Sequence, residues 1–188
     1  MMHASRKTWP CGRLSATSMS PFRTMDGFSR PATLDDVKLL LSALNERAIP
    51  YFLIGGYALA AHGYQRATTD IDLLLPATFE AGVSVKSALM ALPDGAAREL
   101  LPEWFAEGDT IRVADAFVVD LMFTACGETY ESLLPYAETI ALDGIAVHTI
   151  NLAGLLLTKR TVRDKDVSDR LVLERAIAAI AAMRAAER

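Results

Sequence analysis

The first strongly periodic stretch of the chain carries apolar residues three and four positions apart between residues 34 and 47. That spacing places them on one face of an α-helix. Thr33, followed three positions later by Asp36, has the pattern of a capping box, in which the two residues bind each other's backbone N–H groups at a helix start. The pattern therefore predicts an amphipathic helix that begins after Thr33 and ends before Pro50.

Two short apolar runs follow and predict strands. The first, over 51–54, ends at Gly55-Gly56, which indicates a buried strand that turns sharply into a helix over 57–62. The second, over 70–75, begins with alternating polar and apolar residues and then becomes wholly apolar up to Pro76. This change is typical of a strand that enters a core.

The remaining elements alternate between helix and strand without a regular repeat. The pattern predicts helices over 78–92, 130–137, 152–162 and 167–184, a strand over 145–150, and a hairpin of strands 110–114 and 117–123 that turns at Asp115-Ala116. No internal repeat is visible. We therefore expect an α+β fold, with a small mixed sheet flanked by helices and the C-terminal helices packed alongside.

Length and composition predict one domain with appendages. A chain of 188 residues that is 52% hydrophobic can bury one good core but not two full-sized ones. Residues 1–31 are rich in Ser, Pro, Gly and Thr and predict a disordered basic tail, and a translation start at Met19 or Met25 is an open alternative. The expected organisation is this tail, an α/β core over 32–151 and a helical segment over 152–188.

Charge and cysteine content narrow the class of protein further. The first 31 residues hold five of the 19 basic residues and one of the 23 acidic ones, so the rest has a formal charge near −8. Such an acidic body disfavours non-specific binding to nucleic acid, and an RNA partner would need a local basic patch. Cys11 and Cys126 form no disulfide framework or zinc motif, and no apolar run reaches the ~18 residues of a membrane span. We expect a cytoplasmic protein without a membrane partner.

Two acids on the second predicted strand are candidates for holding a metal ion. Side chains two apart on a strand point the same way, so Asp70 and Asp72 project together, about 7 Å apart at the backbone. A magnesium ion is commonly held by one or two carboxylates together with substrate phosphates. Taken alone the pair is weak evidence, because an acid-rich chain contains such pairs by chance.

Neighbouring residues strengthen this interpretation. At Gly55 and Gly56 the bare backbone can approach a phosphate group, although an ordinary tight turn is the alternative. Arg66 and Thr68 lead into Asp70 and offer a guanidinium and a hydroxyl group that could orient phosphates. The sequence thus predicts an anion site beside the two carboxylates.

A third acid interrupts an otherwise apolar strand. Asp120 lies within the run 117–123, and a lone buried charge is costly unless a cation or a donor meets it. Placed opposite Asp70 and Asp72, it would complete a site for one or two metal ions, whereas on an edge strand it would simply face water. Further on, Lys159 and Arg163 stand four apart, on one face of the predicted helix, either towards phosphates or as part of a solvated surface.

Together these motifs resemble the nucleotidyltransferase superfamily, and most of all the AbiEii-type toxins and minimal nucleotidyltransferases. The resemblance rests on Gly55-Gly56-Tyr57-Ala58, His62-Gly63, Arg66-x-Thr68-x-Asp70-Ile71-Asp72, the later Asp120, and the Lys-containing stretch 156–169. It departs from the superfamily at Tyr57, where many members have a serine that touches a phosphate. It implies that Asp70, Asp72 and Asp120 bind two Mg²⁺ ions and are catalytic, and that Gly55, Gly56, Arg66, Thr68, Lys159 and Arg163 bind the nucleotide.

The implied activity is transfer of a nucleoside monophosphate from an NTP such as ATP to an acceptor hydroxyl. The acceptor is open among an RNA end such as that of tRNA, a protein and a small molecule. One alternative is a catalytically silent nucleotide-binding module of a toxin–antitoxin-like pair, with an antitoxin or a second copy as its partner. Another, a metal-dependent phosphohydrolase, is disfavoured because this chain offers few histidine ligands.

Overall fold

The computed structural model describes residues 29–64, 66–161 and 163–186. The predicted basic tail therefore lies, up to residue 28, outside the described residues. Among the described helices, none is both long and apolar enough to cross a bilayer.

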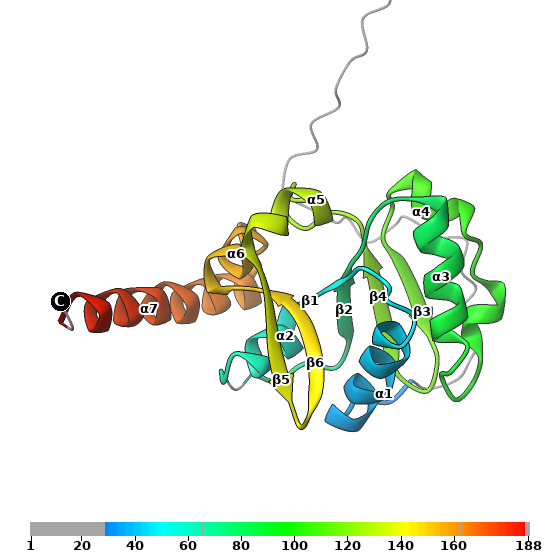
Figure 1. Ribbon diagram of the computed structural model, residues 1–188, viewed down its shortest axis with the longest axis horizontal. Coiled ribbons are helices and arrows are strands. Elements are labelled where there is room, and N and C mark those ends of the chain that lie inside the picture. The colour runs from blue at the N-terminus through cyan, green and yellow to red at the C-terminus, as the bar shows by residue number, and fades with distance from the viewer. Residues whose placement is uncertain (1–28, 65, 162, 187–188) are drawn as a thin grey trace, which may run out of the picture.

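Six strands form a single mixed sheet in the order β3-β4-β2-β1-β6-β5. Their bounds are β1 (Phe52–Ile54), β2 (Ile71–Leu74), β3 (Ile111–Ala114), β4 (Val118–Met122), β5 (Ala137–Leu142) and β6 (Ile145–Ile150). The pairs β1–β2, β3–β4 and β5–β6 are antiparallel, whereas β2–β4 and β1–β6 are parallel. Figure 1 shows helices flanking this sheet, which confirms the expected α+β class.

The helices cover the sheet and carry the predicted caps. Their bounds are α1 (Leu34–Asn45), α2 (Gly55–Ala61), α3 (Phe79–Leu89), α4 (Glu103–Glu107), α5 (Tyr130–Leu133), α6 (Leu152–Leu157) and α7 (Asp164–Ala186), with 3₁₀ turns η1 (Ala96–Glu99) and η2 (Leu134–Tyr136). The capping box of Thr33 and Asp36 is present at the start of α1. The α1 helix packs against α3 and β6, and α2 packs against β1 and β2.

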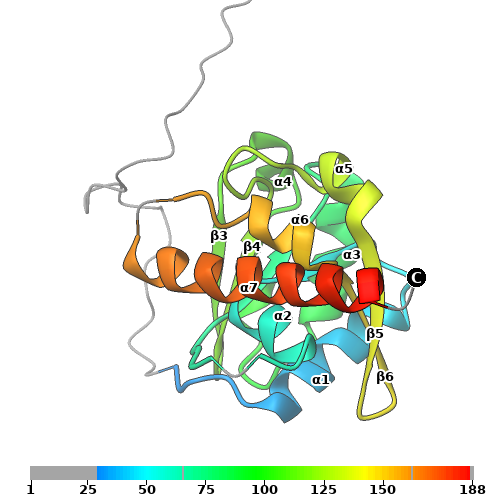
Figure 2. The same cartoon turned by 90° about the vertical axis from the view of Figure 1, so that its left-hand side faces the viewer.

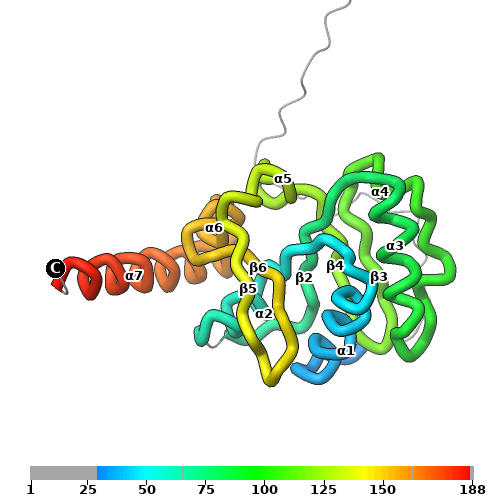
Figure 3. The backbone as a smooth tube through the Cα atoms, in the orientation of Figure 1, coloured from blue at the N-terminus to red at the C-terminus, as the bar shows by residue number. Residues whose placement is uncertain are grey.

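The core lies under one face of the central strands. Ile71, Leu73, Val119 and Leu121 are fully buried, whereas the residues between them on β2 and β4 are partly exposed, Leu74 at the end of β2 excepted. This alternation shows that β4 has a partly open face, although its sequence predicts burial on both faces. Figure 3 follows the backbone from β3 and β4 at one edge of the sheet to the β5–β6 hairpin at the other. The open face of the central strands is where polar chemistry can be placed.

The last helix packs alongside the body over its first half only. Leu173 and Ala176 of α7 are buried, and α7 contacts α6. Beyond them the helix projects away from the body, as Figure 1 shows, and in the turned view of Figure 2 it runs across the front of α2 and α6. Ile180 and Met183 are accordingly 39% and 65% exposed.

The prediction of a helix over 130–137 is wrong in its second half. The helix α5 ends at Leu133, a 3₁₀ turn containing Pro135 follows, and Ala137 already begins β5. Asp143 and Gly144 both have positive φ angles and form the turn between β5 and β6. Asp-Gly is a favoured pair for such two-residue hairpin turns, so this strand was within reach of sequence reasoning.

Candidate active site

A row of charged side chains runs across three neighbouring strands. Arg112 on β3 is the direct cross-strand partner of Asp120 on β4, and Asp120 is in turn aligned with Asp72 on β2. Side chains opposite one another on paired strands project to the same face of the sheet. Asp70 lies just before β2, and its carboxylate reaches the same guanidinium as Asp120. The structure thus brings the three predicted acids to one face and adds an arginine to them.

Arg112 binds Asp120 through two nearly parallel hydrogen bonds. Its Nε donates to Oδ1 of Asp120 at 2.8 Å, and its Nη2 donates to Oδ2 at 2.7 Å. The same Nη2 lies 3.4 Å from Oδ2 of Asp70. The hydrogen bonds to Asp120, reinforced by the charges of the three acids, raise the pKa of Arg112 despite its partial burial. The guanidinium therefore acts as a permanent cation in this row.

Asp72 is held in an unfavourable environment for a carboxylate. Burial, together with the neighbouring charge of Asp120, raises the pKa of Asp72 to about 6, although Lys159 and Lys165 act in the opposite direction. A desolvated carboxylate beside a second one is stabilised by a cation. The surroundings of Asp72 are therefore those expected of a carboxylate that binds a metal ion.

The glycine pair lets two functional side chains approach the start of α2. A Cβ atom on Gly55 would lie 1.9 Å from Oδ2 of Asp72, and one on Gly56 would lie 2.5 Å from Nη1 of Arg66 and 2.6 Å from Cβ of Thr68. Gly55 also has a φ angle of +70°, which side chains rarely adopt. The backbone at this turn is therefore in direct contact with the carboxylate of Asp72 and the side chains of Arg66 and Thr68.

Replacing Gly55 by Ala is expected to lower the melting temperature and to displace the carboxylate of Asp72. A left-handed non-glycine residue costs roughly 1–2 kcal/mol, and the clash with Asp72 adds to this cost. Gly63→Ala is the matched control, because Gly63 also has a positive φ angle but has open space around its Cβ position. Thermal unfolding of the two variants measures the difference. Equal destabilisation would show that Asp72 does not depend on the bare backbone at residue 55.

Tyr57, the residue at which the resemblance departs from the superfamily pattern, is hydrogen-bonded to a segment outside this turn. Its hydroxyl donates a hydrogen bond to the backbone carbonyl of Ala32. The N-cap residue of α2, Ile54, makes no side-chain hydrogen bond to the described residues at the start of this helix. Tyr57 thus fastens the segment that precedes α1 and does not replace the missing serine.

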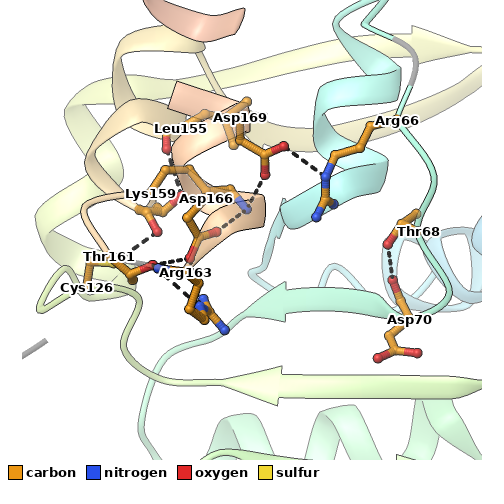
Figure 4. A network of polar contacts seen from close by, with 11 residues as sticks. Arg66, Thr68, Asp70, Cys126, Leu155, Lys159, Thr161, Arg163, Asp166 and Asp169 are labelled. Atoms are coloured by element: carbon orange, nitrogen blue, oxygen red, sulfur yellow. Dashed lines mark hydrogen bonds and ion pairs between the residues drawn. The ribbon is translucent and has the colours of Figure 1, made fainter. Parts of the chain in front are cut away.

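The predicted phosphate-binding cations lie in a buried ion-pair network next to the acids. Figure 4 shows the ammonium of Lys159 between two carboxylates, 3.3 Å from Asp166 and 3.0 Å from Asp169. The Nε of Arg66 binds Asp169 at 2.8 Å, and the Nε of Arg163 binds Asp166 at the same distance. The network therefore joins the segment before β2 to the first turns of α7.

The carboxylate of Asp166 is the centre of this network. Burial alone would raise its pKa, but the Thr161 hydroxyl and the charges of Lys159 and Arg163 together lower the pKa of Asp166 below its ordinary value. The contact of Lys159 with Asp169 is an ion pair that lacks hydrogen-bond geometry at Oδ2. Lys159 is thus engaged by two carboxylates, whereas the side chain of Arg163 remains 54% exposed.

The prediction that Lys159 and Arg163 share one helical face is wrong. The α6 helix ends at Leu157, where the Thr158 hydroxyl binds the carbonyl of Leu155, and α7 begins only at Asp164. Such a side-chain bond competes with the helical hydrogen-bond pattern. Lys159 and Arg163 lie on the connecting segment instead, and both turn towards Asp166.

The carboxylates of the site suit a magnesium ion that is held partly by nucleotide phosphates, rather than one held by protein ligands alone. Within the described ranges, no three His, Cys, Asp or Glu side chains are arranged to hold a metal ion. Magnesium needs only one or two carboxylates when substrate phosphates and waters supply the other ligands. Asp70 and Asp72, two residues apart, can supply these carboxylates.

Sequence reasoning missed two residues of this arrangement. Arg112 was not singled out, although the predicted hairpin placed it on the strand that pairs with Asp120. The role of Asp169 was missed because the stretch around it is dense in charges and reads as a solvated surface. Both residues hold candidate site residues by direct ion pairs, Arg112 on Asp120 and Asp169 on Arg66.

No family profile and no curated protein matches this sequence. Among solved structures, the chain is similar to the solution structure of the antibiotic-resistance factor ANT(2'')-Ia, with 15% sequence identity and a TM-score of 0.41. The alignment covers 79% of this chain and 94% of that one.

Proposed function

We propose that the protein is a nucleotidyltransferase that moves a nucleoside monophosphate from an NTP to an acceptor hydroxyl. The observation that carries the proposal is the position of Asp72. Its largely buried carboxylate lies against Gly55, is aligned with Asp120, and is stabilised by the positive charge of Lys159 and Lys165. The acids would bind the metal ion and the neighbouring basic side chains would bind the phosphates, which is the charge arrangement that a metal-bound triphosphate requires.

The reaction would form one phosphorus–oxygen bond and break another. The acceptor oxygen attacks the α-phosphorus, the bond between the α-phosphorus and the bridging oxygen breaks, and pyrophosphate leaves with the electron pair. The acceptor proton passes to a carboxylate, for which Asp120 is our candidate. Magnesium, when bound, would neutralise the phosphates and lower the pKa of the acceptor hydroxyl.

The chain's own residues would bind and orient the nucleotide. Asp70 and Asp72 would hold the metal ions, with Asp120 as a ligand of the second ion, and the open backbone at Gly55 and Gly56 would admit a phosphate. Arg66 and Arg163 each use Nε in an ion pair, so their remaining N–H groups are candidates for phosphate oxygens. The proposed class is the nucleotidyltransferase superfamily, close to the AbiEii-type toxins, with the acceptor open among an RNA end, a protein and a small hydroxylated molecule.

A silent nucleotide-binding module is the second candidate function. Arg112 neutralises Asp120 directly, and the described acids do not enclose a metal ion. A protein that binds a nucleotide without turnover could keep this arrangement permanently. Analysis of products with labelled nucleotide separates the two: label joined to an acceptor supports transfer, and tight binding without turnover supports the module.

The first test is thermal unfolding with each of the four NTPs, with and without magnesium. A ligand that binds only the folded state raises the melting temperature, and a concentration of 100 times its Kd corresponds to about 2.7 kcal/mol. We expect a magnesium-dependent rise with particular NTPs in the wild type and none in Asp70→Asn/Asp72→Asn. Asp109→Asn, at an exposed position, controls for loss of negative charge. A rise that persists in the double variant would contradict the proposed site.

A further inference from the structure

Arg112 lies where a cation would be expected to bind the candidate acids. Its guanidinium spans Asp120 and Asp70, with both carboxylate oxygens of Asp120 engaged. The side chain of Asp120 is 13% exposed, whereas that of Arg112 is 59% exposed. The carboxylate is therefore fixed within the fold, and the cation reaches it from the solvent side.

The position of Arg112 in the sheet allows it to leave. It belongs to β3, one of the two edge strands of the described sheet, and its neighbours along the strand, Ile111 and Val113, are buried on the opposite face. The arginine side chain is long and flexible, so its guanidinium can turn into solvent while the strand stays in place. Its contact with Asp70, at 3.4 Å, is the weaker of the two.

We propose that Arg112 is a built-in counter-cation for Asp120, and that a divalent ion reaches Asp120 only by displacing it. This inference rests on the proposed function in taking the acid row as the metal site. The nucleotide-free protein then keeps Asp120 neutralised. Metal binding at Asp120 becomes a competition between a bound guanidinium and an incoming ion.

Titration with Mn²⁺ in the absence of nucleotide tests this competition. The electron paramagnetic resonance signal of free Mn²⁺ reports how much metal each variant binds. Removing a unit positive charge a few ångströms from the metal position is expected to lower the Kd for Mn²⁺ by about tenfold or more in Arg112→Gln. Arg112→Lys keeps the positive charge but loses the paired hydrogen bonds to Asp120, so its Kd for Mn²⁺ should lie between those of the wild type and Arg112→Gln.

Two controls separate local competition from general electrostatics. Arg47→Gln removes the same charge at the end of α1, where Arg47 is 3.8 Å from Glu46 on the surface, and should leave the Kd unchanged. In Arg112→Gln/Asp120→Asn the gain should disappear, because the released ligand is absent. Circular dichroism and thermal unfolding establish whether each variant is folded. If Arg112→Gln does not fold, the comparison is made with Arg112→Lys.

Several results would overturn the proposal. These are an unchanged Kd in Arg112→Gln, an equal gain in Arg47→Gln, a gain that survives in the double variant, and no Mn²⁺ binding in any variant. The titration contains no nucleotide, so it is independent of the NTP-dependent unfolding test. If Arg112→Gln lowers the Kd for Mn²⁺ but no NTP raises the melting temperature, the row of acids is a metal site and the proposed transferase function is contradicted. If an NTP raises the melting temperature but Arg112→Gln leaves the Kd unchanged, only the proposed role of Arg112 is contradicted.

Discussion

Replacing Lys159 by Met is expected to lower the free energy of unfolding by about 3 kcal/mol. The side chain of Lys159 is 9% exposed, and its ammonium lies between Asp166 and Asp169, whose side chains are 0% and 5% exposed. Removing one partner from a buried ion pair typically costs 3–5 kcal/mol, because the remaining charge stays buried. Arg66 and Arg163 still contact the two acids, which places the expected loss at the lower end. Urea unfolding measures it as a lower midpoint at unchanged slope.

The same substitution at a surface ion pair is the matched control. Lys38 binds Asp35 and Asp143, whose side chains are 88% and 62% exposed, so Lys38→Met should change the midpoint far less. A Lys159→Met variant with wild-type stability that loses the NTP-dependent rise would contradict the structural role. It would show that Lys159 leaves its carboxylates and binds phosphate, as the superfamily resemblance implies.

The sequence predicts well those parts of the fold that depend on local signals. The capping box at Thr33, the glycine pair after β1 and the alternation along β2 each concern residues a few positions apart, and all three appear in the structure. These elements bring Gly55 and Asp72 into contact through the antiparallel pair β1–β2, in which Ile54 is opposite Asp72. The acid and glycine parts of the candidate site therefore follow from short-range patterns.

Arg112 shows why the rest of the site could not be predicted. A hairpin with a two-residue turn at Asp115-Ala116 would place Arg112 opposite Val119, on the core side. The structure has a longer turn, with Ala114 paired to Val118, which places Arg112 opposite Asp120. A shift of one residue in register moves every side chain to the other face of a sheet. The sequence does not determine this register, and the ion pair depends on it.

The ion-pair network of α7 depends on burial, which charge patterns do not reveal. Lys159, Asp166 and Asp169 occur in a stretch with eight charged residues between positions 159 and 170, and such stretches usually face solvent. In the structure the three are buried and each is paired with an opposite charge, Lys159 with both acids and Asp169 also with a cation from a distant part of the chain. Arg66, more than a hundred positions earlier in the sequence than Asp169, is one of these partners.

Asp72→Asn is expected to stabilise the metal-free protein near neutral pH and to lower the rate of nucleotidyl transfer strongly. Burial raises the pKa of Asp72 from 3.8 to about 6, so folding favours the protonated carboxyl group. The resulting stabilisation is complete below about pH 4 and is lost as the pH rises through about 6. A shift of this size corresponds to roughly 2–3 kcal/mol at pH 7.5, which Asn does not lose because it carries no charge.

Other acids vary with pH in the opposite sense, so the difference between variant and wild type is the quantity to measure. Asp36 and Asp166 have lowered pKa values in the folded chain, and the stability that they contribute is lost as the pH falls. Both contributions are present in wild type and in Asp72→Asn and cancel in the difference. The melting temperature of Asp72→Asn minus that of the wild type should therefore increase between pH 4.5 and 7.5.

Magnesium with a bound NTP should reverse this order. The wild type gains stability from a ligand that its carboxylate helps to hold, and Asp72→Asn does not, so the stability difference between them shrinks or changes sign. Transfer activity should fall by about 100-fold or more, since a metal ion supplies several kcal/mol of charge stabilisation in the transition state. Asp109→Asn, an exposed acid, should behave as wild type in both measurements. If Asp72→Asn is no more stable than the wild type at pH 7.5 and still gains stability from magnesium and NTP, the Asp72 carboxylate is neither destabilised by burial nor a metal ligand. If Asp72→Asn is more stable than the wild type and still gains stability from magnesium and NTP, burial does destabilise the Asp72 carboxylate, but the metal ion binds to other acids of the row.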